Sequence, residues 1–160
     1  MTSKAIFAAG CFWGVQFYFD QIDGVTDSVV GYTGGHTISP SYEDVCSHTT
    51  GHAEAVELTF NPEIVSYETL LQQFLYMHDP TQFGGQGPDI GDSYRSAIFY
   101  IDDSQRVAAQ NFIDQAAAQY NDPIATELAV AGDFWPAEDY HQKFAERTGR
   151  GMCHKPFKSM

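Results

Sequence analysis

Residues 5–22 read AIFAAGCFWGVQFYFDQI, and they contain the first strand and the first helix that the sequence predicts. The apolar run from Ala5 to Ala9 has the length of a buried strand, and Gly10 then permits a sharp turn. Beyond the turn, apolar side chains recur at a helical spacing, at Trp13, Val15, Phe17, Tyr18 and Ile22. Gly24 ends this pattern. The chain therefore starts with a strand that leads almost directly into a helix.

Strands and helices are also predicted along the rest of the chain. Apolar runs predict strands over Val25 to Tyr32, Ala53 to Phe60, Tyr94 to Ile101 and Ile124 to Ala131. Helices are predicted after the capping residue Ser66 as far as Asp79, from Ser104 to Tyr120, and from Ala137 to Arg147. The order strand, helix, strand, strand, helix, strand is the ferredoxin-like split pattern. We therefore expect an α+β fold: a ferredoxin-like βαββαβ two-layer sandwich with an appended helix and strand.

Two long irregular segments, Thr33 to His52 and Thr81 to Ser93, are expected to wrap around this sandwich. Loops of that length in a compact domain are more often functional than idle. No repeat, low-complexity tract or linker divides the chain, so we expect a single catalytic domain over residues 1–160. Its Gly-punctuated tail, from about 148 to 160, is expected to be flexible.

Composition excludes several classes of function. Eight Lys and Arg residues against 21 Asp and Glu give a net charge of −13, which argues against binding to nucleic acid or to an anionic membrane. No apolar stretch approaches the length of a transmembrane helix. Ala8-Ala9-Gly10-Cys11 resembles a lipid-attachment box, but the apolar segment before it is too short for a signal peptide. We expect a cytoplasmic protein and, since heptads are absent, a monomer.

Cys11 is the first candidate for chemistry, because it lies where the first strand becomes the first helix. The unsatisfied N–H groups and positive dipole end of a helix N-terminus favour a thiolate there. The alternative is a small buried hydrophobic residue, but the flanking Gly10, Phe12, Trp13 and Gly14 favour a reactive cysteine. Phe12 and Trp13 are typical of a core, and beside a nucleophile they equally fit an apolar wall for a methyl group.

Glu54 is the second candidate. Strict alternation in the strand 53–60 places Glu54 on the more apolar face, at its open end. A carboxyl buried there without a cation has a raised pKa and stays protonated near neutral pH, as a general acid requires. Alternatively, the strand frays at its start and Glu54 is solvated. The residues alone leave both interpretations open.

The other two cysteines have different contexts. The three cysteines form no Cys-x-x-Cys and cannot all pair internally, so a structural disulfide framework is not expected. Cys153 lies in the Gly-punctuated tail, where a thiol can reach a distant partner as a resolving cysteine must. The alternative for Cys153 is an unreactive tail thiol. Cys46 has no such context and is interpreted as a spectator.

The six histidines do not indicate a metal site. His48 and His52 are four positions apart, but the intervening Gly51 argues against a helix there, so no metal is expected. A Cys-His hydrolase with His52 or His141 as base is an alternative. Nothing in the sequence pairs either histidine with Cys11.

The pentapeptide Gly10-Cys11-Phe12-Trp13-Gly14 resembles the signature of the methionine sulfoxide reductase A family. Other segments resemble the same family in the expected order: 31–35 (GYTGG), 42–46 (YEDVC), 50–56 (TGHAEAV), 78–80 (HDP), Asp89, 94–96 (YRS) and 137–139 (AED). The similarity covers nearly the whole chain. Many relatives carry a second recycling cysteine in a Gly-rich tail, whereas His154-Lys155-Pro156 follows Cys153 here. A single resolving step is therefore the simplest expectation.

The resemblance implies reduction of the S epimer of methionine sulfoxide, either free or within proteins and peptides. It implies that Cys11 is the nucleophile and that Glu54 is the acid. It also implies that Tyr42 and Tyr94 hydrogen-bond near the sulfoxide oxygen.

The family pattern further implies that Phe12 and Trp13 form the pocket for the substrate's methyl group. It places Asp89 where substrate or water is positioned, and Cys153 where a resolving cysteine stands. No cofactor is implied, because a thioredoxin-like protein or a dithiol reduces the resulting disulfide.

Two other functions remain as alternatives. A thiol peroxidase also cycles through a sulfenic acid and a disulfide, but it needs no aromatic methyl pocket. A non-catalytic binder of oxidised methionine needs no nucleophile, so the presence of Cys11, Glu54, Tyr42 and Tyr94 together argues against it.

Overall fold

The structure is a computed structural model that describes residues 1–151 and 154. The helices are α1 (Phe12–Asp20), α2 (Tyr42–Cys46), α3 (Tyr67–Met77), α4 (Asp103–Ala117) and α5 (Phe144–Thr148). The strands are β1 (Ser3–Ala9), β2 (Val25–Thr33), β3 (Ala53–Phe60), β4 (Gly85–Gln86), β5 (Asp89–Ile90), β6 (Ser96–Tyr100), β7 (Glu127–Val130) and β8 (Trp135–Pro136). Two 3-10 turns, Asp92–Tyr94 and Asp139–His141, complete this mixed α+β structure.

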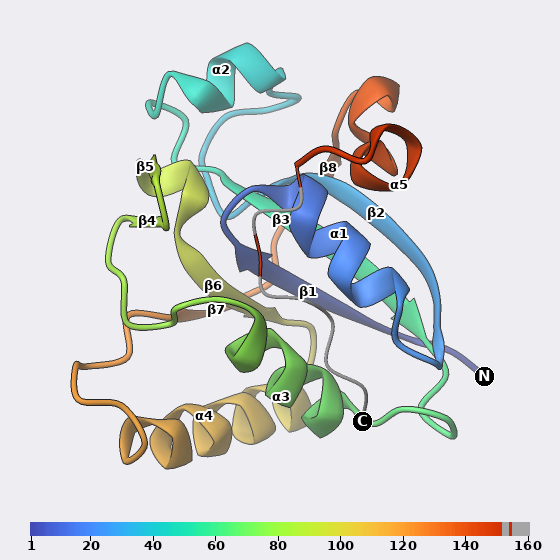
Figure 1. Cartoon of the computed structure of the whole chain (residues 1–160), viewed down its shortest axis with the longest axis vertical. Coiled ribbons are helices and arrows are strands. Elements are labelled where there is room, and N and C mark those ends of the chain that lie inside the picture. The colour runs from blue at the N-terminus through green and yellow to red at the C-terminus, as the bar shows by residue number, and fades with distance from the viewer. Residues whose placement is uncertain (152–153, 155–160) are drawn as a thin grey trace.

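Six of the strands form one central sheet in the order β7-β6-β1-β3-β2-β8 (Figure 1). β1 pairs antiparallel with both β3 and β6, and β2 pairs antiparallel with β3 and β8. β7 is parallel to β6. β4 and β5 form a separate small hairpin. The central position of β1 and β3 means that the end of β1 and the start of β3 are held side by side.

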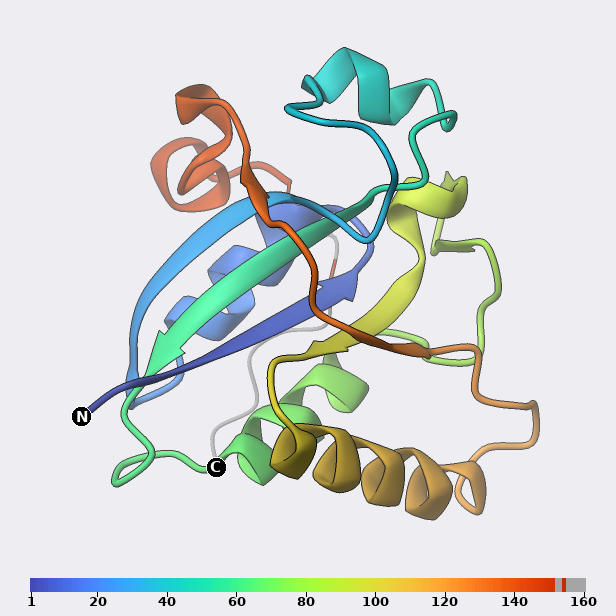
Figure 2. The same ribbon diagram turned by 180° about the vertical axis from the view of Figure 1, so that it is seen from behind.

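The two faces of the sheet are covered differently. On one face α1, α3 and α4 bury the main core, in which the Phe7 ring stacks on Phe19 at 5.4 Å and on Phe74 at 5.0 Å between ring centroids. Because side chains alternate along a strand, the neighbouring Ala8 lies on the opposite face, in a second cluster of mostly small residues. Figure 2 shows the chain after β7 running across that face, where Phe134 packs.

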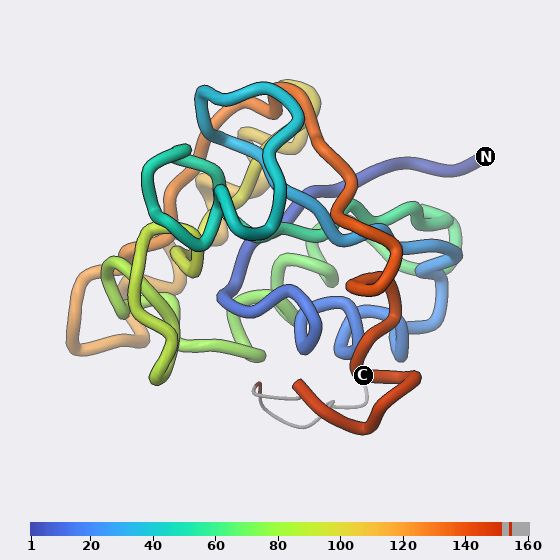
Figure 3. The backbone as a smooth tube through the Cα atoms, turned by 90° about the horizontal axis from the view of Figure 1, so that it is seen from above, coloured from blue at the N-terminus to red at the C-terminus, as the bar shows by residue number. Residues whose placement is uncertain are grey.

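The prediction of one continuous helix from Ala137 to Arg147 is wrong. The chain instead forms the 3-10 turn Asp139–His141, then α5, with Lys143 between them in the left-handed conformation at φ 56°. Contacts with α1 outweigh helical propensity here. The Lys143 N–H donates to Gln16 Oε1 at 2.8 Å, and its ammonium contacts Asp20 Oδ2 at 2.8 Å. Figure 3 shows α5 beside α1 as a result.

Several other predicted boundaries also change. The segment 33–52 is not wholly irregular, because Ser41 caps α2 in a reciprocal capping box with Asp44. The segment 81–93 contains the β4–β5 hairpin. The strands predicted at 94–101 and 124–131 shorten to β6 and β7, since Tyr94 ends a 3-10 turn. The helix predicted at 104–120 is α4, which Asp102 caps.

The predicted tail is described only in part. Gly149 follows α5 in the left-handed conformation at φ 70°, which glycine adopts readily. Residues 152–153 and 155–160 lie outside the described residues, and Cys153 is among them. In the part of the chain that the structure does describe, no helix is long and apolar enough to cross a membrane.

Candidate active site

Cys11 occupies the junction between the central strand and the first helix. Gly10 makes the turn with φ 92°, and Cys11 is then the N-cap residue of α1. A side chain at Gly10 would meet the Gln86 Cβ at 2.8 Å, so both the backbone angle and the available space require glycine. Cys11 remains partly exposed. The predicted sharp turn is therefore present, and it presents the thiol at a helix N-terminus.

Glu54 lies beside this turn, near the start of β3, and is 1% exposed. Its Oε1 accepts a hydrogen bond from the Phe12 amide at 3.2 Å. Its Oε2 is also buried and has no hydrogen-bond partner among the described residues. Burial raises the pKa of Glu54 to about 8, against the lowering effect of the Phe12 amide and with a further small increase from the charge of Asp89. The burial predicted from alternation is confirmed, and Glu54 is mainly a neutral acid at pH 7.

Two tyrosine hydroxyls, one from each long loop, lie near this carboxyl. Tyr42 begins α2 and Tyr94 ends the 3-10 turn before β6. Both hydroxyls lie close enough to the Cys46 thiol to influence its pKa. Burial is the largest cause that raises the pKa of Tyr42 and of Tyr94 well above the ordinary tyrosine value, and the Glu54 charge adds to it. Both tyrosines are therefore neutral O–H donors near the acid.

Cys46 is therefore part of this cluster, while its interpretation as a spectator in the chemistry stays a prediction. Burial raises the pKa of its thiol, while the hydrogen bonds from Tyr42 and Tyr94 oppose that change. A raised pKa disfavours the nucleophilic thiolate. The location of Cys46 fits a partner of the two hydroxyls better than a second nucleophile.

Aromatic rings form one side of the site. Phe12 is 1% exposed and packs on Tyr32, with ring centroids 5.7 Å apart. Trp13 is partly exposed and stacks on Phe144 in α5 at 3.8 Å between centroids. The break in the predicted C-terminal helix therefore supplies a ring that supports Trp13.

Two residues of this site were not predicted in their observed positions: Glu138 was missed as a functional candidate, and His141 was considered only as a hydrolase base. Glu138 accepts a hydrogen bond from the Tyr32 hydroxyl at 2.9 Å and another from the Tyr42 amide at 3.0 Å, so it ties the first long loop to the sheet. His141 accepts a hydrogen bond from Trp13 Nε1 at 2.9 Å. The family-like segment 137–139 was the available signal for Glu138.

The histidines proposed as hydrolase bases have other partners. His141 is engaged with Trp13 through Nδ1. His52 Nδ1 accepts from the Gly35 amide at 3.0 Å, and its Nε2 lies 2.8 Å from the Thr37 carbonyl oxygen. His52 therefore holds the first long loop together. Within the described residues, no group of three His, Cys, Asp or Glu side chains is arranged to hold a metal ion.

A pocket opens beside Cys11. Cys11 and Asp89 both line it, together with Met77, His78, Asp79 and Gln86. The predicted positioning residue Asp89 therefore lies in the same pocket as Cys11, the predicted nucleophile. His154, from the C-terminal segment, also reaches this place, where its Nε2 lies 2.5 Å from the Ala9 carbonyl oxygen.

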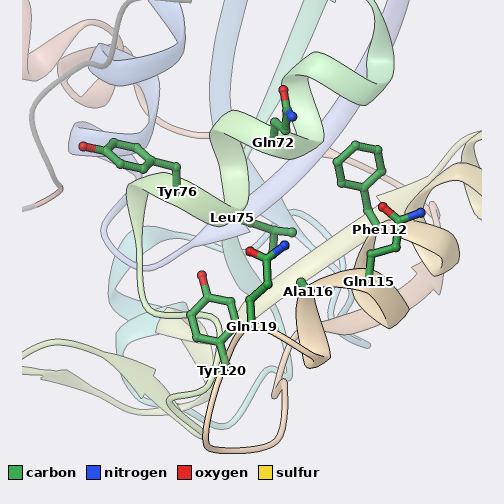
Figure 4. A pocket seen from close by; sticks show the side chains of 8 residues that line it. All are labelled: Gln72, Leu75, Tyr76, Phe112, Gln115, Ala116, Gln119 and Tyr120. Atoms are coloured by element: carbon green, nitrogen blue, oxygen red, sulfur yellow. The ribbon is translucent and has the colours of Figure 1, made fainter.

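A second hollow lies between α3 and α4 and has a different character. Figure 4 shows its lining side chains, among them Gln72, Leu75, Tyr76, Phe112, Gln115 and Tyr120. The lining contains neither a cysteine nor a carboxylate. The pocket beside Cys11 is therefore the part of the candidate active site next to the thiol, and Glu54, Tyr42 and Tyr94 are not among its described lining residues.

A cysteine at a helix N-terminus with a neutral carboxylic acid beside it fits a thiol-dependent oxidoreductase. The family model described as peptide methionine sulfoxide reductase matches residues 3–160. The chain belongs to the peptide methionine sulfoxide reductase family, and its activity is the reduction of methionine sulfoxide.

Individual relatives agree with this assignment. A peptide methionine sulfoxide reductase MsrA from Acidobacterium capsulatum is 49% identical over 154 residues, which cover 95% of this chain and 99% of that protein. Mxr1 from Saccharomyces cerevisiae in its reduced form superposes with a TM-score of 0.88 at 30% identity, covering 94% of this chain and 87% of that one. The structure of Mxr1 in complex with Trx2 gives a TM-score of 0.65 at 25% identity, over 90% and 85% of the two chains.

Proposed function

We propose that the enzyme reduces methionine-S-sulfoxide, free and within oxidised proteins and peptides, with Cys11 as nucleophile and Glu54 as acid. The sulfur of a sulfoxide is electrophilic, but its oxygen leaves poorly until it is protonated. The reaction therefore needs a soft nucleophile and an acid at the same S=O bond. The observation that carries the proposal is the buried Glu54 carboxyl. It has a pKa of about 8 and accepts a hydrogen bond from the amide of Phe12, the residue after Cys11.

The proposed first step is attack of the Cys11 thiolate on the sulfoxide sulfur. Because Oε1 of Glu54 is occupied by the Phe12 amide, the proton is carried by Oε2 and is donated to the sulfoxide oxygen. The hydroxyls of Tyr42 and Tyr94 hydrogen-bond the same oxygen as negative charge develops on it. Exchange with water then releases methionine and leaves Cys11 as a sulfenic acid. Two electrons pass from the cysteine to the substrate sulfur.

The aromatic side of the site supports recognition of the S-methyl group. The support is that Phe12 and Trp13 follow Cys11 directly at the start of α1 and that Trp13 is partly exposed. We propose that they receive the methyl group while Asp89 orients the remainder of the substrate or a water molecule. The support for Asp89 is that it shares the pocket with Cys11.

We propose that Cys153 condenses with the sulfenic acid of Cys11, forming a disulfide and releasing water. A thioredoxin-like protein or a dithiol then reduces the disulfide by exchange, so no bound cofactor is proposed. The support for this partner is that the structurally similar Mxr1 has been captured with Trx2. The contact of His154 with the Ala9 carbonyl brings the neighbour of Cys153 in sequence close to Cys11.

The strand order β6-β1-β3-β2, with α1 and α3 as crossovers, supports a ferredoxin-like core to which β7 and β8 are added at opposite edges. We retain this topology as our assignment within the observed α+β class. A single domain over 1–160, a monomer and a cytoplasmic location remain predictions from the sequence.

A single-turnover experiment tests the proposal. The reduced enzyme is mixed with racemic N-acetyl methionine sulfoxide, and the N-acetyl methionine formed, the sulfur configuration of the remaining sulfoxide and the free thiols are then measured. We expect about one N-acetyl methionine per enzyme, a matching depletion of the S epimer, and the loss of two thiols. If only one thiol were lost, the proposed resolving step would be contradicted, but the proposed reduction by Cys11 would stand. Thiol loss with hydrogen peroxide but no methionine from the sulfoxide would contradict the proposed reaction.

A further inference from the structure

His48 connects the two long loops that frame the site. It follows α2 in the loop 33–52, and its backbone has the left-handed conformation at φ 60°. Residues other than glycine adopt this conformation infrequently, because their Cβ crowds the backbone. They persist there where the surrounding contacts compensate for the strain, and such positions are common at functional sites. The contacts of the His48 side chain therefore explain why the loop takes this path.

The imidazole of His48 packs against the end of the second long loop. Its Nδ1 lies 3.2 Å from the Ser93 Oγ and 3.6 Å from the Asp92 Oδ1, both in the 3-10 turn Asp92–Tyr94. Asp92 Oδ1 is buried and has no hydrogen-bond partner among the described residues, so a polar neighbour reduces the cost of its burial. Because the His48 and Asp92 side chains are both partly exposed, attraction between their charges contributes little. The fit of the ring is therefore the main part of this contact.

The second loop leaves space for the His48 ring at Gly91. Gly91 has φ 133°, and a Cβ at this position would lie 2.4 Å from His48 Cε1 and 2.7 Å from Nδ1. Both the backbone angle and the available space therefore require glycine opposite the imidazole. Positive φ angles in both loops, at His48 and at Gly91, thus serve one contact between the loops.

This contact lies beside a proposed hydroxyl donor. The imidazole of His48 meets the Tyr94 ring edge-on, with 6.1 Å between the ring centroids. The Tyr94 amide donates to the Gly91 carbonyl at 3.1 Å, so the residue that leaves space for His48 also begins the turn that carries Tyr94. Two positions before His48, Cys46 lies near the same tyrosine hydroxyl. The loop that carries Tyr42 and Cys46 is thus joined to the turn that carries Tyr94.

We propose that His48 is a positioning residue for the Tyr94 hydroxyl, and that it acts by fastening the loop 33–52 to the turn Asp92–Tyr94. The inference rests on the proposed role of Tyr94 as a hydrogen-bond donor to the sulfoxide oxygen. A donor stabilises developing charge best when it is already held in place, because reorientation during the reaction costs free energy. Tyr94 lies on a single 3-10 turn, so a contact from the other loop adds a constraint on its ring.

Glycine replacements separate the side-chain contact from the backbone angle. His48→Gly removes the imidazole but accepts φ 60°, so the loop can keep its path. Ser39→Gly is the matched control. Ser39 is exposed in the same loop and is also a non-glycine residue with a positive φ, at 48°. Both replacements relieve the same kind of backbone strain, but only His48→Gly removes a contact with Tyr94.

A double-mutant cycle with Tyr94→Phe tests whether His48 acts through the hydroxyl. Tyr94→Phe removes the hydroxyl but keeps the ring that His48 contacts. The measured quantity is the single-turnover rate constant for N-acetyl methionine formation by the reduced enzyme at saturating sulfoxide. We expect His48→Gly to lower it about fivefold in the original enzyme but less than about 1.5-fold in Tyr94→Phe, because the effects of coupled residues do not add. Ser39→Gly should leave the rate constant unchanged in both backgrounds.

The alternative outcomes are distinct. A single-turnover rate constant does not depend on the fraction of enzyme that is folded, so a partial loss of stability does not imitate the expected effect. Equal decreases in the two backgrounds, or no decrease with His48→Gly, would overturn the proposal for His48. If Tyr94→Phe reacted as fast as the original enzyme, the proposed role of Tyr94 would be wrong and this inference would fail with it. Absence of N-acetyl methionine with the original enzyme would instead overturn the proposed function.

Discussion

The carboxyl of Glu54 accepts a hydrogen bond from the amide of Phe12 at 3.2 Å, although 42 positions separate the two residues. The bond fastens the acid to the first turn of α1, directly after Cys11. It is made because β1 and β3 are neighbours in the sheet, which brings the start of β3 to the end of β1. The distance between Cys11, the proposed nucleophile, and Glu54, the proposed acid, is therefore set by the sheet and not by a mobile loop.

Replacing the nucleophile should remove activity without unfolding the protein. Cys11→Ser retains the size of the side chain at the N-cap of α1 but replaces a soft sulfur with a much weaker nucleophile. We expect methionine formation below about one part in a thousand, measured by product analysis, with an unchanged melting temperature. Cys46→Ser is the matched control and should keep most of the activity, because a hydroxyl can replace the thiol between Tyr42 and Tyr94. Substantial turnover by Cys11→Ser would disprove the assignment of the nucleophile.

Replacing the acid should slow the chemical step. Glu54→Gln keeps an oxygen for the Phe12 amide but has no acidic proton to give to the sulfoxide oxygen. The expected loss is roughly 10²- to 10⁴-fold in the single-turnover rate of methionine formation, the usual range for a lost general acid. A near-normal rate would mean that another group protonates the substrate.

The same substitution should stabilise the fold near neutral pH. The pKa of Glu54 rises from 4.5 to about 8 on folding, so the folded state binds the proton more tightly than the unfolded state. Below about pH 4.5 both states are protonated and no penalty arises. As the pH rises from 4.5 towards 8, the unfolded state ionises first and stability falls. Glu54→Gln removes this cost, and urea unfolding at pH 7 should show a gain of roughly 1–3 kcal/mol that shrinks at pH 5.

Activity should also depend on pH through this carboxyl. The proton of Glu54 is present below its pKa of about 8 and is lost above it. We expect the single-turnover rate, measured with saturating sulfoxide, to decrease as the pH rises from 8 to 10. The residual rate of Glu54→Gln should lack this decrease. A decrease of equal size in both proteins would assign it to a different group.

Gly14 should matter for recycling more than for reduction of the sulfoxide. A Cβ at Gly14 would overlap His154 Nδ1 and would lie 3.0 Å from the Gly151 carbonyl oxygen. Gly14→Ala should therefore displace the C-terminal segment from α1. We expect thioredoxin-driven turnover to fall at least fivefold relative to the single-turnover rate. The double variant Gly14→Ala/His154→Ala removes the overlap, so its thioredoxin-driven turnover should be no lower than that of Gly14→Ala. If the ratio of thioredoxin-driven turnover to single-turnover rate is the same in Gly14→Ala and the original enzyme, this role of Gly14 in recycling is contradicted.

The sequence by itself determined the parts of the site that depend on local periodicity. The apolar run and the turn at Gly10 predicted that Cys11 begins a helix. The period of two in β3 predicted which face carries Glu54. Both inferences succeed because the geometry of a strand or of a helix start is set by neighbours a few positions apart.

Only the tertiary structure decided how the loops complete the site. Tyr42, Tyr94 and Cys46 lie on segments without a period, and long-range contacts such as the Glu138 bond to the Tyr42 amide bring them together. The predicted C-terminal helix failed for the same reason, since contacts with α1 hold Lys143 in a left-handed conformation. That break places His141 against Trp13. Local sequence patterns do not predict such contacts, because the residues that form them lie more than one hundred positions apart in the sequence.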